Sequence, residues 1–189
     1  MVLEIVKYGH PALRERGEKI RQIDQTVRAL AADMLETMRD AQGVGLAAQQ
    51  VGRALQLFVV DVGEVEDRPS TLEIGGQLVS LEAHMPMVLI NTEVQPLGEP
   101  ETGPEGCLSF PEIYADITRP RQVQVQALNE EGDPVRFCCG GLLARAIQHE
   151  HDHTRGILFI DRMPRSVKTE LQAELDALHA ATKASLRPR

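Results

Sequence analysis

The segment His149-Glu150-His151-Asp152-His153 constrains this chain more than any other, because it reads His-Glu-x-x-His inside a helical run of residues. The run from Leu142 to His153 has helical periodicity, and Gly156 follows it as a signal for a helix C-terminus. His149 and His153 share one face of such a helix, so both can bind a single metal ion. Glu150 lies beside the first histidine and can act as a general base on water near that ion.

The five-residue motif alone leaves one alternative open. A polar, solvated helix face would contain the same residues without binding any metal. His151 lies on a different face of the helix from His149 and His153, so we expect it not to be a ligand.

A catalytic site of this type needs a third protein ligand and one open position. Helix geometry separates the three cysteines of the chain. Cys139 precedes His149 by ten residues, which in a helix of ~1.5 Å rise per residue is roughly 15 Å, too far for a metal–sulfur bond of ~2.3 Å. Cys138 fails for the same reason, and we expect both to be small buried hydrophobes. Cys107 has no such obstacle, and Gly106 before it allows the backbone to approach a metal or a substrate closely.

Composition limits the functions that this chain can have. With 189 residues it can bury one core, so we expect a single domain over residues 1–189. A net charge of -8 argues against direct nucleic-acid recognition, and three cysteines without a disulfide pattern suit a reducing compartment. The sequence shows neither a membrane-spanning apolar run nor a secretory signal, so we expect a cytoplasmic protein without membrane attachment.

Apolar periodicity predicts an α+β fold in which short, mostly antiparallel strands surround the central metal-binding helix. An N-terminal helix is predicted from Asp24 to Ala41, with Asp24 as the N-cap, and a C-terminal helix from about Ser166 to Ala181. The tail from Lys183 to Arg189 is expected to be frayed.

Apolar and turn-forming residues mark the remaining elements. We expect a loop at Gly43–Gln50, a long excursion with a hairpin at Gly63–Pro86, and a turn at Asn129–Asp133. The predicted strands are Leu57–Val60, Met87–Asn91 and Gln122–Leu128.

Three segments, in this order along the chain, resemble the signature motifs of the peptide deformylase family. They are Gly43-Val44-Gly45-Leu46-Ala47-Ala48-Gln49-Gln50, Glu105-Gly106-Cys107-Leu108-Ser109 and the segment from His149 to His153. His10-Pro11-Ala12-Leu13-Arg14 also resembles the start of that family, so the likeness covers nearly the whole chain.

The resemblance implies a metal ion held by Cys107, His149 and His153, with Glu150 as general base and acid. It assigns stabilisation of the charge on the formyl oxygen to the Gln50 side-chain amide and the Leu108 backbone N–H. Iron(II) is the implied native ion, and zinc, nickel or cobalt can replace it in purified protein. The implied substrate is the N-formyl-methionyl end of a newly made protein, and docking to the ribosome is left open.

An extended substrate is expected to pair with the exposed edge around Gly45, and Gly106 permits its close approach. The methionine side chain needs an apolar pocket, for which Val44, Leu142 and Ala146 are the candidates. Plain core packing is the alternative for Leu142 and Ala146.

Two charged residues near the metal-binding helix need separate interpretation. Arg145 lies one turn before His149, where the family often has an apolar pocket residue, so we expect it either to narrow the pocket or to lie across its rim with its stem covering apolar surface. Asp152 either pairs with Arg119 behind the metal site or is a solvated carboxylate.

Two other functions are compatible with part of the pattern. A zinc peptidase of the His-Glu-x-x-His type would usually take its third ligand from another histidine or from a glutamate. A non-catalytic protein would keep the metal as a structural clamp, but a clamp needs neither the base Glu150 nor the amide of Gln50.

Overall fold

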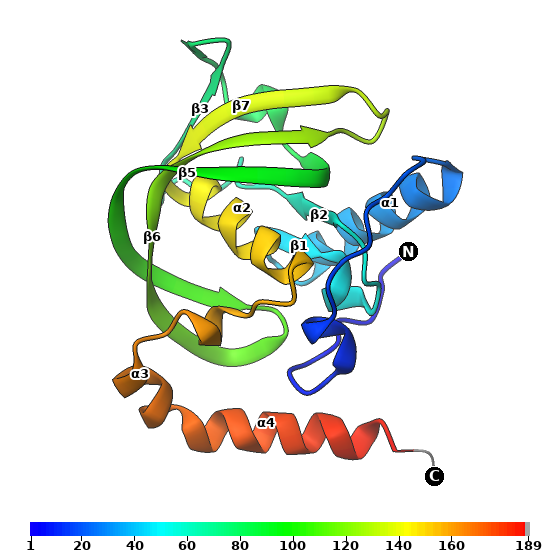
Figure 1. Ribbon diagram of the computed structural model, residues 1–189, viewed down its shortest axis with the longest axis vertical. Helices are drawn as coiled ribbons and strands as arrows, with labels where there is room; N and C mark the ends of the chain where they lie inside the picture. The colour runs from blue at the N-terminus through cyan, green and yellow to red at the C-terminus, as the bar shows by residue number, and fades with distance from the viewer. Residues whose placement is uncertain (188–189) are drawn as a thin grey trace.

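The computed structural model describes residues 1–187 and places helix α2 (Gly141–Thr154) at the centre of the fold (Figure 1). Within those residues, seven strands form one antiparallel sheet in the order β1-β2-β5-β6-β7-β3-β4. The sheet curves around α2, which contacts β1, β2, β3, β6 and β7 and is buried along nearly its whole length. The expected α+β fold, with mostly antiparallel strands around this central helix, is therefore confirmed.

The strands vary greatly in length, and the two longest carry most of the pairing. Their bounds are β1 (Gly45–Ala47), β2 (Leu57–Val60), β3 (Ser70–Ile74), β4 (Gln77–Leu78), β5 (Met87–Cys107), β6 (Phe110–Leu128) and β7 (Pro134–Gly140).

Strand β2 shows why the sheet has a core on each face. All four of its residues are buried. Phe58 and Val60 join the core around α2, whereas Leu57 and Val59 join the core beneath α1 (Gln25–Asp40). Because successive side chains of a strand point to opposite faces, this uninterrupted apolar run requires cover on both sides.

Strands β5 and β6 extend much further than the sequence predicted. The predicted strands cover only one end of each observed strand: Met87–Asn91 is the start of β5, and Gln122–Leu128 is the end of β6. The predicted bounds were therefore too short. Beyond Ile90, β5 pairs with β6 but no longer with β2, which leaves one edge of β5 free. Proline is tolerated on such an edge, and Pro96, Pro100 and Pro104 lie there.

Helix α1 forms as predicted, because the side chain of Asp24 accepts a hydrogen bond from the Val27 N–H at 3.0 Å and caps the helix. Its buried face includes Met34 and Met38, which pack in the same core as Leu46 of β1.

The C-terminal region contains two helices where one was expected. Leu171 separates helix α3 (Arg165–Glu170) from α4 (Gln172–Ser185), which lies along the bottom of the molecule in Figure 1. Leu175 of α4 is buried in a third core, together with Leu13 and Phe110. Helix α4 continues to Ser185, so the prediction that the chain frays from Lys183 onward was wrong for its first residues. The last two residues of that predicted tail, 188–189, lie outside the described residues.

Several shorter elements complete the sheet. The predicted excursion does contain a hairpin, formed by β3 and β4, and Leu72 of β3 pairs with Cys139 of β7. Strand β7 itself was not predicted. The expected turn is present, with the Asn129 side chain accepting hydrogen bonds from the backbone N–H groups of Glu131 and Asp133.

The segment expected as a loop at Gly43–Gln50 is partly regular. It contains β1 and the start of a 3-10 helix, η2 (Ala48–Val51). The other 3-10 helices are η1 (Pro11–Arg14), η3 (Glu82–His84) and η4 (Phe159–Asp161). Among the described residues, none of the helices combines the length and apolar character needed to cross a lipid bilayer.

Candidate active site

The three predicted metal ligands meet between α2 and the end of β5. His149 and His153 lie one turn apart on α2, with ring centroids 5.0 Å apart, and Cys107 is the last residue of β5. The sulfur of Cys107 is 3.4 Å from Nε2 of His153. One ligand atom from each of the three residues lies within 4.8 Å of the others.

This donor set fits a divalent metal ion. Ligand atoms that are ~2.0–2.3 Å from a tetrahedral ion lie roughly 3.3–3.8 Å from one another, which matches the separation of Cys107 and His153. Burial lowers the pKa of His153 well below its ordinary value, which keeps the imidazole in the neutral form that binds metals. One thiolate with two imidazoles suits several divalent ions.

The other two cysteines and His151 lie outside this group. Cys138 and Cys139 are on β7, and burial raises the pKa of Cys139 to about 12, so its thiol stays protonated. The group of potential ligands found among residues 1–187 contains none of the three.

Glu150 lies beside these ligands in a closely fitted position. It is buried, and its Oε2 atom has no hydrogen-bond partner among the described residues. Burial raises the pKa of Glu150 to about 7. A Cβ atom at Gly45 of β1 would overlap the Glu150 carboxylate, so this close packing requires glycine. The carboxylate can therefore exchange a proton with a molecule bound in the site near neutral pH.

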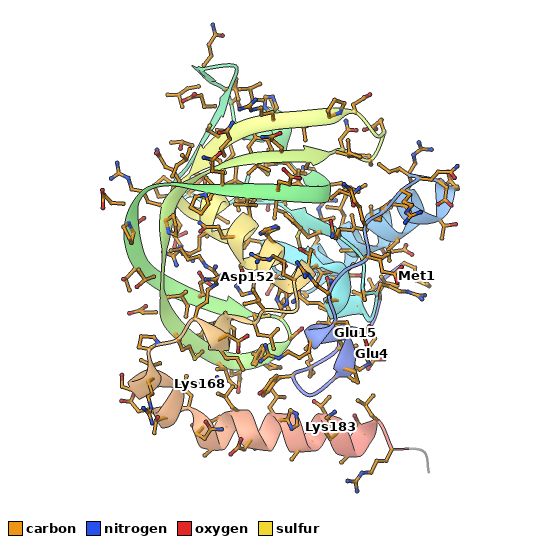
Figure 2. All side chains as sticks on the ribbon, viewed as in Figure 1. Met1, Glu4, Glu15, Asp152, Lys168 and Lys183 are labelled. Carbon is orange, nitrogen blue, oxygen red and sulfur yellow. The ribbon has the colours of Figure 1, made fainter. Side chains whose placement is uncertain are left out.

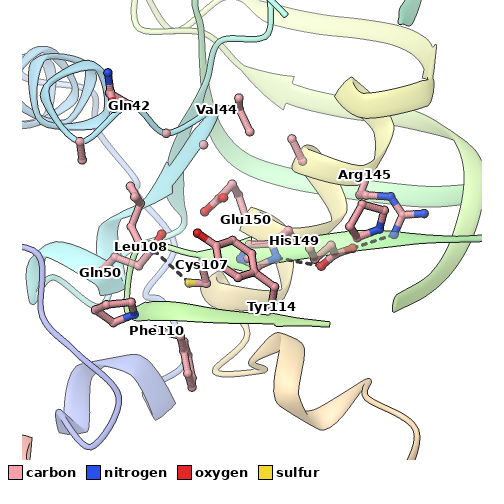
Figure 3. A pocket seen from close by; sticks show the side chains of 18 of the residues that line it. Gln42, Val44, Gln50, Cys107, Leu108, Phe110, Tyr114, Arg145, His149 and Glu150 are labelled. Carbon is pink, nitrogen blue, oxygen red and sulfur yellow. Dashed lines mark hydrogen bonds and ion pairs between the residues drawn. The ribbon is translucent and has the colours of Figure 1, made fainter. Parts of the chain in front are cut away.

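The Gln50 amide is held in one orientation. Its Oε1 atom accepts a hydrogen bond from the Ala47 N–H at 2.8 Å. The Nε2 atom consequently faces the Cys107 sulfur and the Ser109 hydroxyl, each at 3.5 Å (Figure 3). Leu108 lies in the two-residue turn between β5 and β6, across from Gln50. Both predicted donors therefore belong to the walls of the same cavity.

A cavity of about 640 Å³ opens beside Glu150 and Cys107 (Figure 3). The residues predicted for substrate binding all line it; they are Val44, Gly45, Gly106, Leu142, Arg145 and Ala146. Leu142 and Ala146 also belong to the core around α2, so for these two residues the pocket and core interpretations both hold.

Tyr114 is a cavity residue that the sequence analysis missed. It lies on β6 with 69% of its surface exposed, and its ring packs so closely against Gly106 that a Cβ atom there would meet the ring at 2.6 Å. An aromatic residue at an outward position of an alternating strand was the available signal.

Arg145 is bound more firmly than a rim residue would be. Its guanidinium group donates to Glu105 at 3.0 Å and to the backbone carbonyls of Ile117 and Glu101 at 2.8 and 3.0 Å. The side chain is only 11% exposed. Arg145 therefore ties the curved β5–β6 pair to α2 and forms the cavity wall at that point.

Glu105 lies at the centre of this charged network and was also missed as a site residue. It contacts Nδ1 of His149 at 3.0 Å and receives two hydrogen bonds from Arg119. Burial by itself would raise the pKa of Glu105, but the hydrogen bonds from His149 and Arg119 outweigh burial and hold that pKa well below its ordinary value. Its position two residues before Cys107, at the end of the same strand, was the available signal.

The pairing of Asp152 with Arg119 is present, at 2.9 Å, and excludes the solvated alternative. Asp152 is buried on α2 near the centre of the fold (Figure 2). Its carboxylate also accepts hydrogen bonds from Arg162, including one at 2.6 Å. The network thus reaches from the β5–β6 pair through α2 to the segment after it.

Comparison with known proteins identifies the family. The family model described as polypeptide deformylase matches residues 2–169. A peptide deformylase of Opitutus terrae is 44% identical over 99% of this chain and 98% of its own length.

Solved structures agree with that match. The peptide deformylase of Thermotoga maritima superposes with a TM-score of 0.74 at 36% identity, covering 87% of this chain and 99% of that chain. The peptide deformylase of Plasmodium falciparum superposes with a TM-score of 0.83 at 27% identity, covering 97% and 99%. This chain therefore belongs to the peptide deformylase family of hydrolases.

Proposed function

We propose that this chain acts as one metal-dependent catalytic domain that removes the formyl group from the N-formyl-methionyl end of newly made proteins and releases formate. The observation that carries the proposal is the position of Glu150. Its carboxylate has an oxygen without a partner among residues 1–187, next to three metal-ligand side chains and the Gln50 amide. A structural metal clamp would need neither the carboxylate nor the amide.

Cys107, His149 and His153 would hold the metal ion, for which iron(II) is the expected native species, with zinc, nickel or cobalt as substitutes. When bound, such an ion supplies Lewis acidity, which lowers the pKa of water and polarises a carbonyl oxygen. Glu105 fixes the ring of His149 from behind, so that the opposite ring nitrogen is directed toward the ion.

Glu150 moves the proton. Its carboxylate takes a proton from the attacking water and then delivers it to the amine that leaves when the formamide bond breaks. A pKa of about 7 lies near neutral pH, which suits a group that must first accept a proton and then donate it.

Gln50 and Leu108 stabilise the charge that develops on the formyl oxygen. The Gln50 amide is fixed through its oxygen by the Ala47 N–H, which leaves the Nε2 group available as a donor. The Leu108 backbone N–H is the second donor. Donors that are already oriented need no rearrangement during the reaction, and loss of one typically costs ~3 kcal/mol of barrier.

The substrate backbone is expected along β1. This strand is the terminal one of the sheet and pairs only with β2 among the described strands, so an extended peptide can add to its free edge. The methionine side chain would then occupy the apolar wall of the cavity formed by Val44, Leu142 and Ala146. This function places the protein in the cytoplasm, where formylated chains emerge, with contact to the ribosome as a further expectation.

A formate-release assay combined with metal analysis tests the proposal. Protein loaded with iron(II), nickel(II) or cobalt(II) should release formate from formyl-Met-Ala-Ser and leave the internal peptide bonds intact. Cleavage of internal bonds without formate release would indicate the zinc-peptidase alternative instead.

A matched pair of cysteine variants tests whether Cys107 is a metal ligand and Cys138 is not. Cys107→Ser should lose both bound metal and activity. Cys138→Ser, on β7, should keep both. Equal metal content in the two variants would contradict the ligand assignment.

A further inference from the structure

The N-terminal segment from Val6 to Tyr8 joins the two sides of the cavity that carry the proposed oxyanion donors. The Val6 N–H donates to the carbonyl of Gln50 at 2.9 Å, and the Tyr8 N–H donates to the carbonyl of Ser109 at 3.0 Å. Between them, Nζ of Lys7 donates to the carbonyl of Leu108 at 2.8 Å. Three successive residues thus bind both η2 and the turn between β5 and β6.

The turn at Leu108 depends on these bonds because strand pairing does not extend through it. Cys107 pairs with Phe110, and the register shifts between Gly106 and Cys107. Leu108 therefore has no partner in the ladder. Its side chain packs against Gly43, where a Cβ atom would meet it at 2.7 Å, and its carbonyl is held by Lys7. These two restraints hold the Leu108 side of the peptide group that carries its N–H, and the pairing of Cys107 with Phe110 holds the other side.

Lys7 is also close to the reacting region. It is half-buried and lines the same cavity as Cys107 and Glu150. Burial lowers the pKa of Lys7, and electrostatic interactions with Cys107 and Glu4 oppose that lowering. A charged donor binds a carbonyl more strongly than a neutral one does, so this bond can hold a turn firmly.

We propose that Lys7 is a positioning residue, which holds the Leu108 carbonyl so that the Leu108 N–H is directed at the formyl oxygen of the substrate. The inference rests on the proposed function, because it takes the Leu108 N–H as an oxyanion donor. Lys7 acts through Leu108 rather than by touching the substrate. Its contribution is therefore made in the transition state, and the ground-state affinity for the peptide changes little.

Two substitutions test this role. Lys7→Met keeps the length of the side chain but removes the charged donor, whereas Lys7→Arg keeps a charged donor. For Lys7→Met we expect kcat on formyl-Met-Ala-Ser to fall roughly tenfold, with KM within about twofold of the parent, because an oxyanion donor is misdirected rather than deleted. Lys7→Arg should recover most of the loss. Lys183→Met, on α4 (Figure 2) and outside the cavity lining, removes the same charge and should leave kcat unchanged.

The division between kcat and KM decides the outcome. A rise in KM with unchanged kcat would show that Lys7 binds the peptide directly, and an unchanged kcat and KM would show that it has no role; either result overturns the proposal. A loss of kcat that Lys7→Arg does not recover would also overturn it. If Lys7→Met does not fold, Lys7→Gln, which retains a neutral donor, replaces it. The expected result is again a lower kcat with little change in KM.

A variant of Gln50 separates this inference from the proposed function. Gln50→Ala should lower kcat on its own, and Lys7→Met should add less than its single effect to a Gln50→Ala background if both act on the same oxyanion. Full activity of Gln50→Ala would contradict the oxyanion assignment itself. Loss of activity in Gln50→Ala with no effect of Lys7→Met would contradict only the role of Lys7.

Discussion

The carboxylate of Glu105 lies 3.0 Å from Nδ1 of His149, so the end of β5 supplies both a proposed metal ligand, Cys107, and the group that orients a second proposed ligand on α2. A carboxylate in this position fixes the tautomer and the ring orientation of a metal-binding histidine. Arg119 and Arg145 hold Glu105 in turn, and all three side chains are buried or nearly so. The geometry of the metal site is therefore set by the pairing of β5 with β6 as well as by α2.

Glu105→Gln should weaken metal binding by roughly 10–100-fold, as loss of an orienting partner of a metal ligand typically does. The amide also leaves Arg145 without its carboxylate partner and leaves Arg119 paired with Asp152 alone, so the free energy of unfolding should fall as well. A competition titration with a chelator measures the metal dissociation constant. Glu101→Gln, on the same strand but with an exposed side chain, is the control. Equal affinities for the two variants would remove Glu105 from the metal site.

Glu150→Ala and His153→Ala should separate proton transfer from metal binding. Glu150→Ala keeps all three ligands, so it should bind metal normally while kcat/KM falls by about 10²–10⁴-fold, the usual contribution of a general base. His153→Ala should lose both the metal and the activity. Metal content per chain, measured beside formate release, checks both variants. Substantial turnover in metal-loaded Glu150→Ala would exclude this residue as the proton carrier.

The sequence was sufficient to predict that Cys107, His149 and His153 come together, because the main determinants are local. The spacing of His149 and His153 defines one helix face whatever surrounds the helix. Helix rise disfavoured Cys138 and Cys139 as ligands. Both lie apart from the three grouped side chains, but they are on β7 rather than in the helix, so the geometric premise was wrong. The position of both cysteines on β7 explains why they lie outside the group of potential ligands among residues 1–187.

The length of β5 and β6 could not be predicted because it depends on non-local pairing. Proline disfavours the interior of a sheet, and its place on β5 is explained only by the end of the β2 pairing at Ile90, which leaves one edge of β5 free among the described strands. On β6, Arg119 occupies an inward position of an alternating strand, which appears unfavourable until Glu105 and Asp152 are known to neutralise it. The sequence alone therefore could not reveal this charged network, because its members come together only when the chain is folded. The same holds for Arg145, whose partners come from both strands.

Gly45→Ala should reduce activity while leaving the fold intact. The added methyl group would overlap the Glu150 carboxylate, which must then move from its place beside the metal ligands. A displacement of about 1 Å in a catalytic group can cost roughly 100-fold in rate. Gly106→Ala is the contrasting variant, because the group it meets is the exposed ring of Tyr114, which can turn toward solvent. We expect a smaller loss of kcat there, and circular dichroism should show both variants folded.

An effect of Gly45→Ala no larger than that of Gly106→Ala would mean that the Glu150 side chain adjusts freely. The close packing at β1 would then have no part in placing the base.

The ion pair between Arg14 and Asp161 should make stability depend on pH in the acidic range. It joins η1 to η4, and Asp161 also accepts a hydrogen bond from the Leu158 N–H at 2.9 Å. Burial by itself would raise the pKa of Asp161, but Arg14 and the Leu158 N–H outweigh it and lower that pKa from its ordinary value of 3.8. A carboxylate with a lowered pKa in the folded state stabilises the fold above its unfolded pKa, and this contribution is lost as pH falls through the folded pKa.

Arg14→Met should therefore lower the free energy of unfolding near pH 7 by about 0.5–1 kcal/mol, a modest value because both side chains are partly exposed. The difference from the parent protein should shrink as pH falls below about 4, where Asp161 begins to take up a proton in both chains. Urea unfolding of the metal-free proteins at pH 7, 5 and 3 measures it, with Arg16→Met, an exposed neighbour, as the control. A difference that stays constant from pH 7 to pH 3 would show that Arg14 stabilises the fold through packing of its stem rather than through its charge.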